Sequence, residues 1–532
     1  MIRTTWFAMP RRVLLALVVL ACVTGAPARA AELRIGTSAA TSAMDPHFHL
    51  LAFNMSVMAH IFQTLVAQDA DQKLTPDLAT SWRLVDDTTW EFELRHDVKF
   101  HDGSDFTADD VLFSLHRMPL VPNSPSSFAL YMRGVASVEK VDPYRIRFHT
   151  KGPYADLPVD MSMISIVSHV AAAGSAPEGK TTQEMNRGEG TVGTGPYRFV
   201  SFTPGDKVVL ERNDHYWGPR EPWDRVTIVA IPSAASRVAT LLSGGVDVIE
   251  KVPGEDLPRL RSDPRVHVVV APSNSVSYIV IDQYRDNSPG VSGTPEGRNP
   301  LRDVRVRRAL SVAMNRDAIT ERVMSGLATP AAELAAPNMF GANPDAKVDP
   351  FDPDEARRLL GEAGYGNGFD LVLATTNGYY VRDAATAQAI AGYWTRVGVH
   401  TQVDAVPSSV FYAKRGKNEL SAFFTSSSIT TGQASDMLKI LIATRDPAKG
   451  LGQINFGGYS NPETDRLIEG SSHTLDPTAR QDMLRETSRI AIARDHAVLP
   501  VFMEKLAYGI RQPLTYAPRV DKWITAMQVR AP

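Results

Sequence analysis

Apolar and polar residues alternate in several short segments of the first half of the chain. TTWEFELR, residues 88–95, places apolar side chains at every second position, and VEKVDPYRIRFHT continues this pattern around a turn at Asp142-Pro143. GPYRFVSFTPGDKVVLERN, residues 195–213, has the same character around Pro204-Gly205-Asp206. A period of two predicts half-buried strands, and the turn residues predict hairpins. Earlier in the chain, residues 32–38 predict a strand and residues 50–66 a helix.

Helical periodicity replaces alternation in the second half. Val306, Leu310 and Met314 recur at helical spacing after Asp303, which we expect to cap a helix. FDPDEARRLLGEAGY predicts a second helix that begins after Asp352 and ends at Gly364.

A strand, a helix and a second strand follow in that order, as FDLVLAT, AATAQAIAGYWTRVG and VHTQVDAV. Two strands joined by a helix pair in parallel, so this segment predicts a βαβ unit. Residues 285–300, RDNSPGVSGTPEGRNP, predict a surface loop or a seam between two lobes.

The N-terminus predicts export. A basic head is followed by the apolar run 13–23 and by APARA, which fits a signal peptide of residues 1–30 that is cleaved near Ala30. The apolar run is shorter than the roughly 20 residues of a membrane anchor. Because of Arg11-Arg12, the sequence does not decide between the general and the twin-arginine export routes. Because of Cys22, it does not decide between a lipoprotein and a free periplasmic protein.

Charge and cysteine content exclude several classes of protein. Removal of residues 1–30 takes four arginines and no acids from 56 basic and 59 acidic residues, which leaves a net charge of −7. A mildly acidic chain without basic runs does not favour nucleic acid as a partner. The single cysteine lies in the leader, so the mature chain has no disulfide and no thiolate ligand or nucleophile.

One motif imitates a nucleotide site. GSAPEGKT, residues 174–181, satisfies the phosphate-loop pattern GxxxxGK[ST], but that chemistry needs a strand before the loop and a long helix after it. Two glycines follow within nine residues, so we interpret the segment as a flexible polar loop.

Histidines offer a weak metal hypothesis. His47 and His49 would lie on one side of a strand near Asp45, yet HExxH, paired-cysteine and EF-hand spacings are absent. No GxSxG nucleophile motif occurs either. We therefore expect no metal site, no cofactor and no catalytic residues.

FHDGSDFTADDV, residues 100–111, concentrates acids for a structural reason. Asp102-Gly103 is a turn dipeptide, and Thr107 with Asp110 three residues later is a capping box before a helix. Only His101 has no structural explanation from the sequence.

This stretch also carries a family resemblance. TPDLATSWRLVDDTTWEFELRHDVKFHDGSDFTADDVLFSLHRM resembles the family 5 extracellular solute-binding proteins, the dipeptide, oligopeptide, glutathione and nickel receptors of bacterial ABC importers. GTGPYRFVSFTPGDKVVLERNDHYWG, LRDVRVRRALSVAMNRDAI, DPDEARRLLGEAGY and YSNPETDRLIEGSSHTLDPTARQDMLRETSRIAIARDHAVLPVF resemble later blocks of the same family, in the same order.

The resemblance implies an α/β, two-lobed periplasmic binding protein with hinged, discontinuous lobes and an extra subdomain inserted in lobe one. Lobe one would comprise residues 31–62, 191–275 and 505–532. The extra subdomain would be residues 63–190, and lobe two residues 276–504.

The resemblance also implies which loops face the ligand. They carry Thr41, Ser42 and Met44 after the first strand; Asn377, Tyr379, Tyr380 and Arg382 after LVLATT; and Ser426, Ser427, Ser428, Thr430 and Thr431 after SAFF. Hydroxyls and backbone amides would orient the ligand, and Arg382 would either pair with a carboxylate or remain a solvated surface charge.

One departure bears on the ligand. Peptide receptors of the family carry an aspartate in the last of these loops for the ligand's α-amino group, whereas FFTSSSITTGQASD has no acid between Glu419 and Asp436. A buried ammonium without a counter-charge is costly, so the loop argues against a simple dipeptide and is closer to the glutathione-type branch.

The resemblance thus implies a monomeric periplasmic receptor that delivers a peptide-like solute, glutathione-like or a short peptide, to an inner-membrane ABC permease with its ATPase subunits. A secreted hydrolase of peptides or glycans is the alternative from another class. A nickel or metal-chelate receptor is the alternative within the same fold.

Overall fold

The protein is described by a computed structural model, and the residues described are Met1 and 31–532. For Glu296 only the backbone is described. The expected signal peptide lies outside the described residues apart from Met1. Within the described part, no helix combines the length and the apolar character that crossing a membrane requires.

One large sheet organises most of the chain. Its strand order is β13-β15-β17-β12-β18-β11-β1-β10-β9-β8, with β14 paired to β18 and β16 to β15. The strands on the β8 side are β1 (Glu32–Thr37), β8 (Tyr197–Thr203), β9 (Lys207–Arg212), β10 (Arg225–Ala230) and β11 (Val248–Ile249). Those on the other side are β13 (Val291–Ser292), β14 (Ala328–Pro330), β15 (Phe369–Thr376), β16 (Val399–Val406) and β17 (Ala422–Ser428).

Two long antiparallel strands join these sides. β12 (Val266–Ile281) and β18 (Val498–Arg511) pair from Val266↔Arg511 to Val280↔Val498, with register shifts after Pro272 and Ser277. The expected lobe boundaries at 275/276 and 504/505 fall inside these two strands. The two parts of the molecule are therefore connected by continuous, mutually hydrogen-bonded backbone.

A second sheet belongs to the segment between residues 63 and 190. β4 (Ala79–Asp86), β5 (Thr89–Leu94), β7 (Arg145–Thr150) and β6 (Val135–Asp142) form an antiparallel sheet in that order. Two small sheets complete the described strands: β2 (Val66–Gln68) with β3 (Leu74–Pro76), and β19 (Thr515–Tyr516) with β20 (Val529–Arg530).

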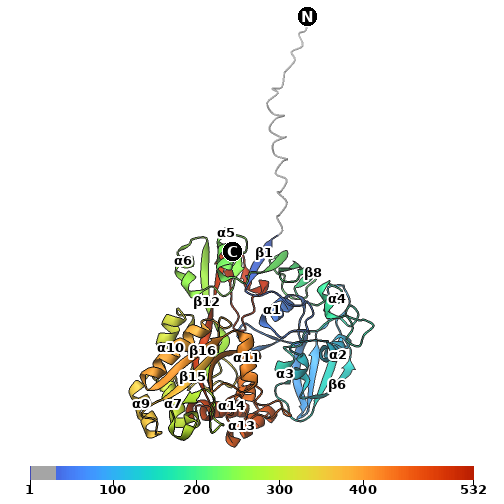
Figure 1. The fold of residues 1–532 in the computed structure, drawn as a ribbon. Helices are drawn as coiled ribbons and strands as arrows, with labels where there is room; N and C mark the ends of the chain where they lie inside the picture. The colour runs from blue at the N-terminus through green and yellow to red at the C-terminus, as the bar shows by residue number, and fades with distance from the viewer. Residues whose placement is uncertain (2–30) are drawn as a thin grey trace.

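The helices fall into three groups in Figure 1. Those of the first group, near β1 and β18, are α1 (Ala52–Ile61), α5 (Ala234–Ser243) and α6 (Leu257–Ser262). The second group, beside β4–β7, is α2 (Ala108–Arg117), α3 (Leu157–Asp160) and α4 (Thr182–Asn186). The third group is α7 (Val304–Val312), α8 (Arg316–Ala318), α9 (Pro353–Glu362), α10 (Asp383–Arg396), α11 (Ser408–Gly416), α12 (Ser435–Met437), α13 (Pro462–His473) and α14 (Pro477–Ser488).

Helix starts follow the sequence signals. Asp303 accepts from Arg305 N, and Asp352 accepts from Asp354 N and Glu355 N, so both predicted caps are confirmed. The predicted βαβ unit is also confirmed, because β15 and β16 pair in parallel on either side of α10. The helix predicted over residues 50–66 is shorter, at Ala52–Ile61.

The acidic stretch 100–111 is a turn followed by a capped helix, as predicted, but the strand expected before the turn is reduced to an isolated bridge between Lys99 and Asp105. Thr107 Oγ1 accepts from Asp109 N at 3.3 Å, and the Asp110 carboxylate accepts from Thr107 N at 2.8 Å. Gly103 has a φ of +88°, which the turn requires. His101, which the sequence left unexplained, bonds through Nε2 to Gly195 O at 2.9 Å and thereby fixes the insert to the segment that leads into β8.

The segment that imitates a phosphate loop leads into a short helix. Thr181 and Glu184 form a capping box at the start of α4, which has five residues. Such a helix is too short to supply the amide array and dipole of a phosphate site.

Separate hydrophobic cores support the parts of the fold. One contains Leu33, Ile35 and Tyr197 around β1 and β8, and another contains Phe92, Phe106 and Phe148 in the insert. The α10 side of β15 and β17 packs on Trp394, and their opposite side on Phe411. Each part thus has its own apolar core to hold its shape.

Candidate functional site

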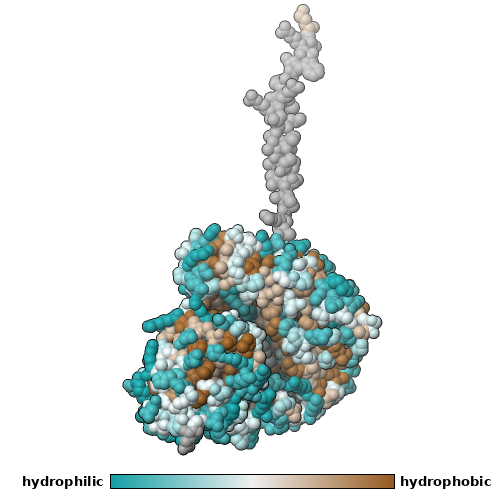
Figure 2. All heavy atoms as spheres, in the orientation of Figure 1, coloured by the Kyte–Doolittle hydropathy of each residue, from teal (hydrophilic) through white to brown (hydrophobic). Residues whose placement is uncertain are grey.

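A hollow separates the part that carries α10 and α11 from the part that carries α1, α2 and α3, and Figure 2 shows it on the molecular surface. On the side of β1, a cavity of about 90 Å³ lies beyond the carboxyl ends of β1 and β11. It is lined by Thr37, Ser38, Ala39, Thr41, Ala52, Phe53, Ser56, Val57, Ile228, Glu250, Lys251, Lys522 and Ile524. Polar groups at carboxyl ends of strands are a common setting for ligands in α/β proteins.

The loop after β1 places its three expected ligand residues differently. Thr41 lines the cavity, whereas exposed Ser42 donates to Asn54 Oδ1 at 3.1 Å. Met44 is fully buried in the core around β1 and has no surface with which to contact a solute. We therefore exclude the Met44 side chain from the proposed contacts.

His47 is part of a buried polar network. Arg117 donates from Nη1 to His47 Nδ1 at 3.0 Å, and His47 Nε2 lies 2.8 Å from Ser165 O. Because a guanidinium only donates and a carbonyl only accepts, the ring is neutral with its proton on Nε2. Burial, and then the charge of Arg117, lower the pKa of His47 to about 4. Both ring nitrogens therefore form hydrogen bonds within the protein, and neither is available as a metal ligand.

The loop between β15 and α10 is organised by Asp383, which the sequence did not single out. Its buried carboxylate accepts from Thr376 Oγ1 at 2.6 Å and from the backbone N–H groups of Gly378, Tyr379 and Tyr380. These bonds satisfy backbone donors of the loop that precedes α10 and hold its shape. The signal in the sequence is an acid at the first position of the helix.

Two of the expected tyrosines join a third in an aromatic cluster. Tyr380 and Tyr412 share a hydroxyl hydrogen bond of 2.7 Å, and Tyr379 packs edge-on against both rings. Tyr379 remains 59% exposed, so its apolar surface is open to a partner. Arg415 lies over the Tyr412 ring at 4.6 Å. Asn377, in the same loop, is exposed.

Arg382 reaches across the hollow. It adopts left-handed backbone at the start of α10 and donates from Nη2 to Glu255 Oε2 at 2.8 Å. Glu255 belongs to the short helix Gly254–Asp256 before α6, on the far side of β12 and β18. The Arg382 charge is therefore paired with a carboxylate in this conformation, while its side chain remains 45% exposed.

The serine run on β17 is divided by strand geometry. Successive side chains of a strand point to opposite faces. Ser427 Oγ meets the Tyr278 hydroxyl at 2.8 Å, whereas Ser426 and Ser428 point to the other face. The three serines therefore contribute to two different surfaces.

The segment that lacks an acid in its sequence still has two carboxylates beside it in the structure, and the argument against a simple dipeptide stays a prediction. Glu504 of β18 accepts from Ser426 Oγ at 3.3 Å, and Asp436 accepts from Thr431 N at 3.3 Å. Glu504 comes from a distant strand and reaches the segment through a tertiary contact, whereas Asp436 follows Thr431 by only five residues in the sequence. The contact with Glu504 is one that the spacing of residues in the sequence does not reveal.

The remaining threonines face the insert. Gln72, in left-handed backbone, donates from Nε2 to Thr430 O at 2.7 Å and to Ile429 O at 3.2 Å. Gln68 Nε2 lies 3.5 Å from Thr431 O. The loop after β17 thus contacts the segment between residues 63 and 190.

A buried group of charges adjoins this contact. Asp156 pairs with Lys439 at 2.6 Å and with Arg480, which tie the start of α3 to the helical turn Leu438–Ile442 after α12 and to α14. Tyr154 donates to Asp160 Oδ2 at 2.5 Å. Burial first, and then the charge of Asp156, raise the pKa of Asp160 well above its ordinary value. Burial likewise raises the pKa of Asp436 to about 6.

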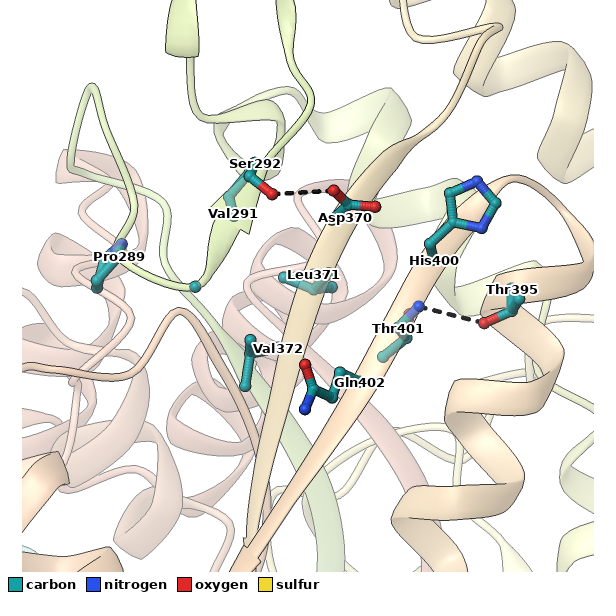
Figure 3. A pocket seen from close by; sticks show the side chains of 11 residues that line it. Pro289, Val291, Ser292, Asp370, Leu371, Val372, Thr395, His400, Thr401 and Gln402 are labelled. Carbon is teal, nitrogen blue, oxygen red and sulfur yellow. Dashed lines mark hydrogen bonds between the residues drawn. The ribbon is translucent and has the colours of Figure 1, made fainter.

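A larger cavity lies away from these loops. It has a volume of about 530 Å³ and lies against β13, β15 and β16, where Ser292 donates to Asp370 Oδ2 at 3.0 Å (Figure 3). His400 and Gln402 also line it, but none of the expected ligand residues does. This sheet edge therefore lies apart from the loops that carry the expected ligand residues.

Comparisons with known proteins agree on the family and the fold. The family described as bacterial extracellular solute-binding proteins, family 5 Middle, matches residues 73–447. The glutathione-binding protein GsiB of Escherichia coli K12 is 28% identical over 483 residues, which cover 89% of each chain.

Solved structures share the architecture at lower identity. CtaP of Listeria monocytogenes, an ABC transporter substrate-binding protein, superposes with a TM-score of 0.81 at 19% identity, over 94% of this chain and 99% of that one. The periplasmic binding protein DppA of Helicobacter pylori, solved with the peptide STSA, gives 0.73 at 22% identity, over 94% and 97%. The expected two-lobed α/β fold is thereby confirmed, and the chain belongs to the bacterial extracellular solute-binding proteins, family 5.

Proposed function

We propose that this protein is the periplasmic receptor of an ABC importer, which captures a peptide-like solute in the hollow and delivers it to a membrane permease with its ATPase subunits. It acts by binding and release as a monomer, without chemistry on the solute. Closure around the solute is sufficient for delivery, because a ligand that binds the closed form better shifts the population towards it.

The observation that carries the proposal is the convergence of polar and aromatic groups from both sides of two continuous strands. Thr41 and Lys522 face the hollow from the side of β1, and Tyr379 and Tyr380 lie at the carboxyl end of β15. β12 and β18 pass between these sides. Residues 31–62, 191–275 and 505–532 would move as one lobe, with residues 63–190 attached to it, and residues 276–504 as the other.

The proposed solute is glutathione-like or a short peptide. Relatives are named for glutathione, and one structural neighbour holds a peptide. In this chain the proposed contacts are Thr41, Ser42, Asn377, Tyr379, Tyr380, Ser426, Ser427, Ser428, Thr430 and Thr431. Arg382 is proposed to act indirectly, by joining the two sides of the hollow through its ion pair with Glu255. Hydroxyls would orient polar ends, and the tyrosines would cover apolar parts.

A thermal-shift screen tests the proposal on the chain from residue 31 onward. The panel comprises dipeptides, longer peptides, glutathione, opine-like compounds and nickel chelates. A solute at 100 times its Kd stabilises the folded protein by about 2.7 kcal/mol, and it should be recovered unchanged from a one-to-one complex. Conversion of a solute to product without a stable complex would favour a hydrolase and overturn the proposal. A panel without any saturable shift would also contradict it.

A further inference from the structure

Lys522 presents a positive charge whose partners are neutral. Its Nζ donates to Ser275 Oγ at 2.6 Å and to Ser428 Oγ at 2.5 Å. Among the described residues, no carboxylate oxygen forms an ion pair with it within 4.0 Å. An ammonium has three N–H donors, so the two hydroxyls orient the group and leave one donor over.

The same lysine lines the small cavity beyond β1 and β11. Lys251 and Glu250 line it too, with the hydroxyl side chains Ser38 and Thr41. Ser38 donates to Glu250 Oε1 from both its backbone N and its Oγ, at 2.7 Å, so that carboxylate is already engaged. The volume of about 90 Å³ has room for a few waters or for a carboxylate with its neighbouring carbon.

Both lysines are held in a backbone conformation that is unfavourable for them. Lys251 has a φ of +50° and Lys522 a φ of +70°, in the left-handed region. This conformation is strained for a lysine, and strained residues cluster at functional sites. Beside Lys522, the Asp521 carboxylate accepts from Trp523 N at 2.9 Å and pairs with Arg519, which fixes the turn.

The carboxylates that act on Lys522 through space, Glu504, Glu250 and Asp521, each bond to other groups. Burial lowers the pKa of Lys522, and Glu504 is the acid that opposes this most strongly. Glu504 is itself buried and accepts from Ser426 Oγ, without an ion pair in the described part of the chain. Serine hydroxyls do not neutralise an ammonium, so an anion placed in the cavity would gain a charge-assisted hydrogen bond.

We propose that Lys522 is the residue that recognises a carboxylate of the transported solute, in the cavity formed by the carboxyl ends of β1 and β11. This inference rests on the proposed function and restricts its substrate class to solutes with a free carboxylate. Ser428 belongs to β17, so Lys522 also links the bound anion to the opposite side of the hollow. Binding of the anion by Lys522 would thereby depend on how the side of the hollow that carries β1 is placed relative to the side that carries β17.

The test measures the affinity of four probes by titration calorimetry. They are glutathione and alanyl-alanine, and their carboxyl-blocked forms, glutathione diethyl ester and alanyl-alaninamide. The variants are Lys522→Met, Lys522→Arg and, as a matched control on the exposed face of β9, Lys207→Met.

For wild-type protein, we expect at least one free acid to bind at least about tenfold more tightly than its blocked form, since a charge-assisted bond is lost on blocking. Lys522→Met should weaken the acid by a similar factor and leave the blocked form within about twofold. Lys522→Arg should retain most of the affinity, and Lys207→Met should behave as wild type.

Equal weakening of acid and blocked form by Lys522→Met would show that the lysine only supports the fold, and it would overturn the inference. So would equal binding of acid and blocked form to the wild type. If the only compounds of the panel that bind lack a free carboxylate, the proposed function stands and this inference is wrong. If another acid of the panel binds, that acid and its blocked form serve as the probe pair, and the same criteria decide. If no compound of the panel binds, both fail.

Discussion

Arg382 donates from Nη2 to Glu255 Oε2 at 2.8 Å and so joins the start of α10 to the segment before α6, on opposite sides of β12 and β18. Both side chains are exposed, at 45% and 64%. Water therefore screens the pair, and its geometry and position matter more than its strength.

Loss of this pair should alter closure more than stability. Arg382→Ala and Glu255→Ala should each change the free energy of unfolding by less than about 1 kcal/mol, because exposed ion pairs contribute little. The double variant should match either single one in solute affinity, since each substitution removes the same contact. Urea denaturation and calorimetry at low and high salt provide the measurements. A large loss of stability in Arg382→Ala alone would assign the arginine a packing role.

Tyr379 should contribute to binding and little to stability. Its ring is 59% exposed and packs edge-on against Tyr380 and Tyr412. We expect Tyr379→Ala to reduce the solute-induced rise in Tm while the Tm without solute stays within a few degrees. Phe351→Ala is a suitable control, because this exposed ring lies beside Tyr393 and outside the hollow. An unchanged shift in Tyr379→Ala would remove the tyrosine from the site.

Thr107→Ala should destabilise the insert without affecting binding. Thr107 and Asp110 form the capping box of α2. Removal of the hydroxyl should cost about 0.5 to 2 kcal/mol in unfolding free energy, as for other helix caps. Solute affinity should stay within about a factor of two. A greater loss of affinity would mean that the position of α2 matters for the hollow.

The pair of Arg117 and Asp45 should be costly to break. Both side chains are fully buried and share two hydrogen bonds of 2.8 Å. Although burial raises the pKa of Asp45, bonding to Arg117 and its charge hold that pKa below the ordinary value. Arg117→Met should therefore cost about 3 to 5 kcal/mol by urea denaturation, because it leaves a buried carboxylate without its partner. Asp45→Asn added to that variant should recover part of the loss.

Lys140→Ala serves as the control for this prediction. Lys140 pairs with Asp109 at 2.7 Å on the surface of the insert. Its removal should change stability by less than about 1 kcal/mol. Similar losses in Lys140→Ala and Arg117→Met would contradict the role that we assign to burial.

Asp436 should give stability a dependence on pH. Burial first, with the charge of Asp156 also contributing, raises its pKa from 3.8 to about 6. The folded state therefore holds this proton more tightly than the unfolded state. The resulting stabilisation is fully present below pH 3.8 and is lost as the pH rises through about 6.

Asp436→Asn should remove this dependence. Relative to wild type, the variant should gain about 2 kcal/mol of unfolding free energy between pH 4 and pH 7. Urea denaturation at intervals across that range measures the difference. A difference that does not vary with pH would show that Asp436 titrates normally in the folded protein.

The sequence by itself determined the local elements and the family. Alternation fixed the strands around residues 88–95 and 195–213, and the caps Asp303, Asp352 and Thr107 occur where spacing predicted them. These features depend on neighbours within a few residues, so their signals lie in the order of the residues.

The tertiary structure decided the composition of the site. Glu504 reaches Ser426 from 78 residues away, Lys522 reaches Ser428 from 94, and Glu255 reaches Arg382 from 127. Strand alternation turned Ser427 away from Ser426 and Ser428, and Met44 entered the core. An acid that is absent from a loop in sequence can still reach that loop in space, because pairing of distant strands sets which charges meet. The spacing of residues along the sequence does not reveal which distant strands pair.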